Sequence, residues 1–144
     1  MKVINEMRLK FLSKSSNESF ARSVVAAFVL EFDPTIAELA DIKTAVSEAV
    51  TNAIVHGYRR ESGMIYIEVK LTDERDVIIK ITDKGVGIED VKEAMQPLFT
   101  TAKEEERAGL GFAVMQNFMD SVKVRSKPEK GTTVTMVKRI VALR

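Results

Sequence analysis

The N-terminal part of the chain changes from an alternating to a helical pattern of hydrophobic residues. Residues 3–12 alternate, with Leu9 and Phe11 on the apolar side, which predicts a half-buried strand. Residues 15–32 then repeat apolar side chains every three or four positions, which predicts a helix with Asn17 as its N-cap. The expected apolar stripe of this helix consists of Phe20, Ala21, Val24, Ala27 and Phe28.

A second, longer helix is predicted from Thr35 to about His56. Thr35 followed by Glu38 is a capping-box pattern, and it comes directly after an Asp-Pro pair that ends the first helix. We expect Gly57 to end the second helix in the left-handed conformation. The residues expected to face the core, at spacings of three and four, are Ile42, Ala45, Val46, Ala49, Val50 and Ala53.

The remaining pattern is that of two strands, a helix and two more strands. Residues 65–71 and 77–81 alternate on either side of a polar turn, which predicts an antiparallel hairpin. A helix is predicted over residues 110–120, and strands over 122–126 and from 132 to about 141. The predicted fold class is α+β: a two-layer sandwich in which helices cover one face of a mixed, mostly antiparallel sheet.

Composition narrows the possible functions. The chain has 144 residues, 45% of them hydrophobic and 30% charged, so we expect one globular domain over residues 1–144. Lysine and arginine number 22 against 21 acidic residues, so direct binding of nucleic acid is not expected. The chain has no cysteine, which excludes disulfides, thiolate zinc sites and thiol nucleophiles. No apolar run reaches the ~18 residues of a membrane span, so we expect a cytoplasmic protein with no membrane partner.

A row of polar residues runs along the second predicted helix. Glu48, Asn52 and His56 are four residues apart, so they return to nearly the same side of a helix and can act on one object. The row borders the apolar stripe of that helix. For His56, capping of the last carbonyl groups is the interpretation we favour over catalysis, and its role stays open.

Four of the seven glycines occur in two close pairs, Gly85 and Gly87 in DKGVGI and Gly109 and Gly111 in GLGF. Paired glycines allow a ligand to approach the main chain, and a nucleotide is the natural candidate. We expect the second pair to open a helix whose N-terminus favours phosphate. Neither a Walker loop nor a dinucleotide fingerprint fits these pairs. The polar residues 88–108 between them are expected to form a lid over the phosphates.

Four motifs in a fixed order resemble a known family. They are EAVTNAIVHG, DKGVGI, AGLGF and GTTV, and in this order they resemble the Bergerat-type ATP-binding fold of the GHKL superfamily. Each motif alone is common, so the resemblance depends on their order and spacing. More narrowly, a chain of this length with an E-x-x-x-N-A-x-x-H-G helix resembles the bacterial anti-sigma serine kinases of sporulation, and the likeness extends over essentially the whole chain.

The resemblance implies ATP and Mg²⁺ as cofactors and a role for each motif residue. Asn52 would bind Mg²⁺ through its amide oxygen, and Glu48 would be the general base that activates a serine hydroxyl. Asp83 would accept a hydrogen bond from the adenine amino group, supported by Thr132. Further nucleotide contacts are expected from Gly85, Gly87, Gly109 and Gly111, and from Thr100, Thr101, Lys103 and Arg107 in the lid, where Arg107 would stabilise the transferring γ-phosphate.

The implied function is that of an anti-sigma factor that is also a serine kinase. It would bind and inhibit a sigma factor of RNA polymerase and phosphorylate an anti-anti-sigma protein on serine. Homodimerisation is also implied, and Arg22 on the first helix is the expected partner surface. The chain has a single histidine, His56, which belongs to the EAVTNAIVHG motif, so the phosphoacceptor should lie on another protein. A nucleotide-gated binding module, a plain ATPase and a structural adaptor remain as alternatives.

Overall fold

A computed structural model of the protein describes residues 1–95 and 103–141. From residue 103 to residue 109 it describes the backbone only. The described residues form five strands and a layer of helices. The elements in chain order are β1 (Val3–Leu12), α1 (Ser16–Val29), a 3-10 turn η1 (Leu30–Phe32), α2 (Ile36–Asn52), a π-helical turn η2 (Ala53–Gly57), β2 (Met64–Thr72), β3 (Asp76–Asp83), α3 (Val91–Met95), α4 (Lys103–Phe118), β4 (Ser121–Lys127) and β5 (Gly131–Arg139).

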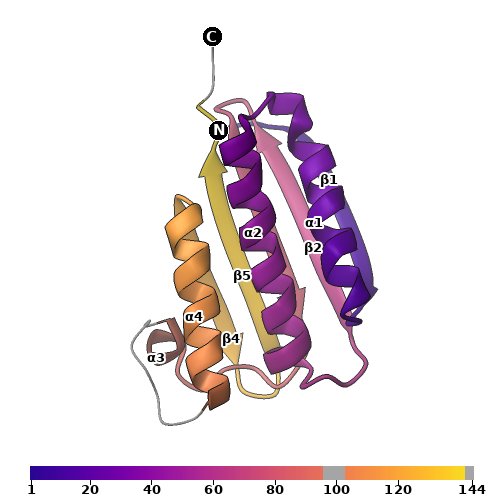
Figure 1. Cartoon of the computed structure of the whole chain (residues 1–144), viewed down its shortest axis with the longest axis vertical. Helices are drawn as coiled ribbons and strands as arrows, with labels where there is room; N and C mark the ends of the chain where they lie inside the picture. The colour runs from indigo at the N-terminus through magenta and orange to yellow at the C-terminus, as the bar shows by residue number, and fades with distance from the viewer. Residues whose placement is uncertain (96–102, 142–144) are drawn as a thin grey trace.

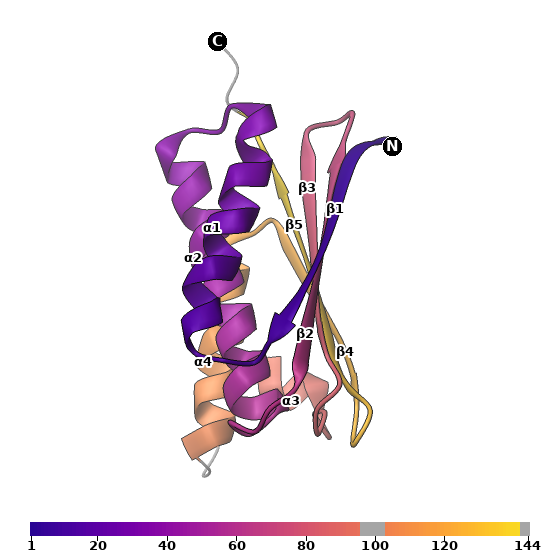
Figure 2. The same cartoon turned by 90° about the vertical axis from the view of Figure 1, so that its right-hand side faces the viewer.

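The strands form one sheet in the order β1-β2-β3-β5-β4, and every pairing in the described part of the chain is antiparallel. The predicted α+β sandwich is therefore confirmed, whereas the expectation of a mixed sheet is wrong. Seen edge-on, α1, α2 and α4 lie on one side of the sheet and leave its other face uncovered (Figure 2). In the front view α2 runs over the middle of the sheet between α1 and α4 (Figure 1).

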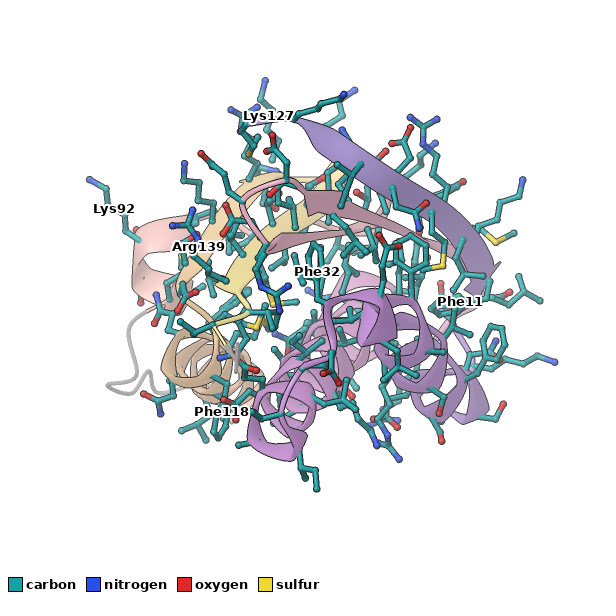
Figure 3. All side chains as sticks on the ribbon, turned by 90° about the horizontal axis from the view of Figure 1, so that it is seen from above. Phe11, Phe32, Lys92, Phe118, Lys127 and Arg139 are labelled. Carbon is teal, nitrogen blue, oxygen red and sulfur yellow. The ribbon has the colours of Figure 1, made fainter. Side chains whose placement is uncertain are left out.

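The core fills the space between the sheet and the helices. Phe11 and Phe32 are buried between the two layers, while Lys92 and Lys127 point outward (Figure 3). The predicted core face of α2 is confirmed for every residue named above, and the alternating residues of β2 and β3 are buried as expected. The fully buried side chains with the largest volumes include Ile42, Val46, Ile65, Ile67, Leu71, Ile79, Phe112, Met115 and Met136.

The sequence predicts the start of α2 correctly but not the start of α1. Thr35 forms the predicted capping box, since its hydroxyl accepts from Glu38 N at 3.0 Å and the Glu38 carboxylate accepts from Thr35 N at 2.9 Å. The predicted cap of α1 is wrong: Ser15 precedes that helix and makes no side-chain cap. Asn17 lies in the first turn, where its amide instead donates to the carbonyl of Leu12 at 2.8 Å.

The apolar stripe of α1 is rotated from the predicted one. Phe20 is 47% exposed and packs edge-on against Phe11, and Ala27 is also exposed. The face that reaches the core consists of Ala21, Val25, Ala26 and Val29. The reason is that α1 lies over the edge strand β1, so part of its apolar surface extends beyond the sheet (Figure 1).

The region between the two glycine pairs also differs from the prediction. The segment expected as a loop over residues 88–108 contains α3 and the first residues of α4. Because α4 begins at Lys103, Gly109 and Gly111 lie inside this helix and do not open it. A phosphate site on a helix N-terminus at this glycine pair is therefore wrong. Within the described residues, no helix has the length and apolar character needed to cross a membrane.

Candidate functional site

A buried carboxylate lies at the centre of the site. Asp83 is the last residue of β3, is only 6% exposed and pairs with Thr132 on β5. Its Oδ1 accepts from the backbone amide of Gly85 at 2.9 Å. Burial raises the pKa of Asp83, while hydrogen bonds from the amides of Gly85 and Thr132 act in the opposite direction. The result is an acceptor fixed in place by backbone groups.

Glycine is required beside this carboxylate because the backbone comes too close for a side chain. A Cβ on Gly57 would lie 2.7 Å from the Asp83 Oδ1, and one on Gly85 would lie 2.0 Å from the carbonyl oxygen of Gly57. The predicted left-handed conformation of Gly57 is wrong, since the positive φ angles after α2 belong to Arg59 and Arg60. Gly57 instead ends the π-helical turn η2 and contacts Asp83 directly.

The loop after β3 lies against two other segments. The amide of Val86 donates to the carbonyl of Gly57 at 2.9 Å, and a Cβ on Gly87 would lie 2.0 Å from the carbonyl oxygen of Lys127, the last residue of β4. Gly87 has a φ of 75°, in the left-handed region that glycine adopts at no steric cost. The two glycines of DKGVGI thus join the end of α2 to the end of β4.

Two residues of the polar row, Asn52 on α2 and His56 on η2, line a cavity together with Asp83, whereas Glu48 is not part of its lining. Glu48 is partly buried, and its pKa is raised first by burial and second by the nearby carboxylate of Glu18 on α1. The Nδ2 atom of Asn52 is buried and has no hydrogen-bond partner among the described residues. Because oxygen and nitrogen of an amide are assigned from their partners, this means that one polar atom of Asn52 is left for a ligand.

Helix α4 brings the second glycine motif to this row. A Cβ on Gly111 would lie 3.0 Å from both amide atoms of Asn52 and 3.3 Å from Glu48 Oε2. Gly111 therefore lies between the two polar side chains that occupy successive turns of α2. The motif glycine and the polar row come together, although the contact is made by the middle of a helix and not by its N-terminus.

The cavity lined by Asn52 and Asp83 is small. Its lining comes from α2, η2, β3, the loop after β3, α4 and β5. The free space in it is about 40 Å³, well below the roughly 300–1,000 Å³ of typical ligand pockets. Larger hollows lie elsewhere, but they do not contain this combination of a buried carboxylate, an unpartnered amide and glycines. The polar and glycine residues that line the cavity are Asn52, His56, Gly57, Asp83, Gly87 and Thr132.

Arg22, which we expect to contact a partner protein, is hydrogen-bonded to the residue next to Glu48. Its guanidinium donates to Glu18 Oε1 at 2.9 Å and to the hydroxyl of Ser47 at 3.3 Å, and its side chain is 38% exposed. Ser47 is the α2 residue before Glu48. Thr100 and Thr101 lie outside the described residues, as do the side chains of Lys103 and Arg107.

Two residues near the site were missed by the sequence analysis. The hydroxyl of Tyr58 accepts from Lys84 N at 2.7 Å and donates to the carbonyl of Met64 at 2.6 Å, which braces the loop after β3. Ser126 on β4 contacts both this loop and Thr132. A signal for Ser126 existed, because it continues the alternation of Val122 and Val124 and is therefore a polar residue at a core-facing position.

The donor set fits a magnesium ion that is held mainly by a nucleotide. The described residues contain no group of three or more histidine, cysteine or acidic side chains that could hold a metal. Mg²⁺ is often bound through one or two protein oxygens together with substrate phosphates. The amide oxygen of Asn52, which lines the cavity, can supply one such ligand, which makes Asn52 the residue of this site that suits the ion.

The chain is similar to known proteins over most of its length. Residues 13–138 match the family model described as the histidine kinase-like ATPase domain. Anti-sigma F factors from Caldanaerobacter subterraneus subsp. tengcongensis and Thermoanaerobacter sp. (strain X514) are 61% and 60% identical over 140 residues, which cover 97% of each chain. An anti-sigma F factor of Clostridium botulinum (strain Eklund 17B / Type B) is 56% identical over 136 residues, or 94% of each chain.

Among solved structures, the RsbU and RsbW domains of Rv1364c from Mycobacterium tuberculosis match with a TM-score of 0.68 at 18% identity, covering 94% of this chain and 32% of that one. A histidine kinase domain from Erythrobacter litoralis EL346 matches with a TM-score of 0.59 at 15% identity, covering 85% and 61%. These two likenesses concern the fold alone. The chain belongs to the histidine kinase-like ATPase domain family and, within it, to the anti-sigma F factor family. The resemblance seen in its motifs is thereby confirmed.

The contact between Gly57 and Asp83 predicts a stability effect. We expect Gly57→Ala to lower the free energy of unfolding by about 1–3 kcal/mol, since the added methyl group overlaps the Asp83 carboxylate. Urea denaturation measures this change. In an Asp83→Ala background the same substitution should cost much less, because the overlapping group is gone. An equal cost in both backgrounds would show that the methyl group clashes elsewhere.

The burial of Asp83 predicts a pH-dependent stability. A raised pKa means that the carboxyl contributes stability below its ordinary value of 3.8 and that this contribution is lost as the pH rises through the raised pKa. Asp83→Asn cannot ionise, so its stability relative to the parent should increase with pH above about 4. Urea titrations of both proteins between pH 4 and pH 7 test this, with the exposed Asp33→Asn as the control. A parent–variant difference that stays constant with pH would contradict it.

Proposed function

We propose that this chain is a Mg²⁺-ATP-dependent serine kinase that also binds a sigma factor. The observation that carries the proposal is the position of Glu48 and Asn52, which lie on successive turns of α2 and meet α4 at the same glycine, Gly111. Asp83 lines the cavity together with Asn52. Membership in the histidine kinase-like ATPase domain family supports ATP as the nucleotide.

In this proposal the buried carboxylate of Asp83 recognises the base. It would accept a hydrogen bond from the 6-amino group of adenine, with Thr132 beside it and Gly85 and Gly87 allowing the base to lie on the main chain. Asn52 would hold a magnesium ion, which neutralises phosphate charge when bound. Thr100, Thr101, Lys103, Arg107 and Gly109 remain proposed contacts of the phosphates, with Arg107 acting on the γ-phosphate.

Glu48 has the properties of a general base in this arrangement. Its pKa is raised by burial and by Glu18, which increases its affinity for a proton. Glu48 would take the proton of a serine hydroxyl while the serine oxygen bonds to the γ-phosphorus and the bond from phosphorus to the β-phosphate oxygen breaks. ADP then leaves, and the phosphoserine stays on the partner protein.

The substrate and partners follow from the relatives. Proteins named anti-sigma F factor are 50–61% identical to this chain, so a sigma factor is the proposed target. An anti-anti-sigma protein would carry the accepting serine, and a homodimer would be the active form in the cytoplasm. Arg22 supports a partner surface on α1, since it is partly exposed and bonded to Ser47, the neighbour of Glu48. A serine that approaches Glu48 would pass this arginine.

Two other functions fit the same fold: an ATPase without a protein acceptor, and a binding module that uses ATP only as a switch. Labelled ATP, magnesium and an anti-anti-sigma protein from the same genome separate the three. Label on the partner's serine supports the kinase, and label only in free phosphate supports the ATPase. Nucleotide-dependent binding of a sigma factor without any phosphate transfer supports the binding module.

The proposed base is tested by Glu48→Gln. Phosphate transfer to the partner should fall by about 10²–10⁴-fold, because an amide cannot take the serine proton. Binding of ATP, measured by calorimetry, should stay close to that of the parent. Glu74→Gln, in the turn between β2 and β3, is the matched control and should transfer phosphate normally. Transfer at the parental rate by Glu48→Gln would exclude Glu48 as the base.

The proposed magnesium ligand is tested by Asn52→Ala. Affinity for Mg²⁺-ATP should fall about 10–100-fold, the range for losing a polar contact to a charged group. With EDTA present, the parent and the variant should bind ATP with similar affinity, since the lost contact is to the ion. If the difference persists without magnesium, Asn52 acts on the nucleotide and not on the metal.

A further inference from the structure

Ser126 forms hydrogen bonds with two segments of the site, the loop after β3 and the start of β5. It lies on β4 opposite Thr132 of β5, with its side chain partly buried, and it does not line the cavity itself. Its Oγ is 2.8 Å from the amide nitrogen of Ile88, 2.9 Å from the carbonyl oxygen of Gly131 and 2.8 Å from the hydroxyl of Thr132. One hydroxyl group thus serves three neighbours.

These three contacts determine where the protons lie. A serine hydroxyl has one hydrogen to donate and two lone pairs to accept with. The amide of Ile88 can only donate, and the carbonyl of Gly131 can only accept, so the hydrogen of Ser126 points to Gly131. Thr132 must then donate its own hydrogen to Ser126. Its oxygen is left with lone pairs alone for any group in the cavity.

The cavity would consequently present two acceptors to a purine base. They are the carboxylate of Asp83 and the hydroxyl oxygen of Thr132, which lie opposite each other at the ends of β3 and β5 and both line the cavity. At position 6, an amino purine offers two hydrogens that both acceptors can share, whereas an oxo purine offers only an acceptor. Buried acceptors left facing another acceptor reject a ligand more strongly than a lost apolar contact does.

We propose that Ser126 is a positioning residue that holds the Thr132 hydroxyl as an acceptor and thereby favours 6-amino over 6-oxo purine nucleotides. The inference rests on the proposed ATP site, and it adds a residue outside the cavity that determines which base is accepted. Ser126 also fixes the loop after β3 through the amide of Ile88, so the same hydroxyl holds both sides of the base-binding end.

The test compares ATP with inosine triphosphate, its 6-oxo analogue, by calorimetry on the full chain with magnesium. The parent should prefer ATP. In Ser126→Ala the Thr132 hydroxyl is free to turn its hydrogen toward the 6-oxo group, so the ratio of the two Kd values should fall roughly threefold to tenfold, the effect of one hydrogen bond. Ser121→Ala, at the exposed start of β4, should leave the ratio unchanged. In a Thr132→Val background, Ser126→Ala should not change the ratio further.

The outcomes separate this inference from the proposed function. If Ser126→Ala keeps its Tm and binds ATP with the parental ratio, the role of Ser126 is wrong and the ATP site stands. A further fall of the ratio in the Thr132→Val background would also overturn it, because the effect would not pass through Thr132. If the parent binds neither nucleotide, the proposed function itself fails. Should Ser126→Ala lose its fold, Ser126→Cys, with a weaker donor of similar size, gives the same comparison.

Discussion

The close approach of three backbone segments around the Asp83 carboxylate is the constraint on which the site depends. The end of the π-helical turn, the loop after β3 and the β4–β5 turn meet at distances that leave no room for a Cβ on Gly57, Gly85 or Gly131. Burying a carboxylate is costly unless backbone donors are supplied, and here the amides of Gly85 and Thr132 supply them. Gly57 is therefore needed for packing against the acid, whereas Gly85 and Gly131 are needed where backbone segments meet.

The polar groups of the site lower the stability of the fold. A carboxyl group at 6% exposure, which is costly to ionise, and an amide nitrogen without a partner both lower the stability of the fold. Neither is explained by packing, since the surrounding core of α2, β3 and β5 is apolar and well filled. Unsatisfied polar groups that lie together at one cavity are typical of binding sites, where a ligand supplies the missing partners. The two groups come from α2 and β3, which the sheet and the core hold in place.

The fold was largely predictable because its signals are local. Alternation marked β2 and β3, and the capping box marked the start of α2, since each depends on neighbours a few residues apart. The errors arose where distant segments decide. Gly57 follows a helix and was assigned a left-handed turn, but the reason for glycine there is the carboxylate of Asp83, 26 positions later. The start of α4 was placed too late, because a Gly-x-Gly motif normally interrupts a helix and here lies within one.

Part of the site was equally readable, and part was not. Spacing alone aligns Glu48 with Asn52, and the strand predicted over residues 77–81 stops two positions before Asp83, the last residue of β3. That Gly111 would lie beside Asn52 depends on how α4 packs on α2, which no spacing within α4 reveals. Ser126 was missed for the same reason, since its partners lie 38, 5 and 6 positions away and only the sheet register brings them together.

The small volume of the cavity limits what can bind there unless one of its walls moves. About 40 Å³ is too little for a nucleotide, so binding one requires a wall to move. The walls on β3 and β5 are held by continuous strand pairing, and α2 is held by its buried stripe. The remaining walls are η2, α4, which lines the cavity through Phe112, and the loop after β3. A nucleotide that binds here must therefore change the position of one of them. If that wall is α4, a protein bound to α4 would respond to the nucleotide, which is the coupling that the proposed function needs.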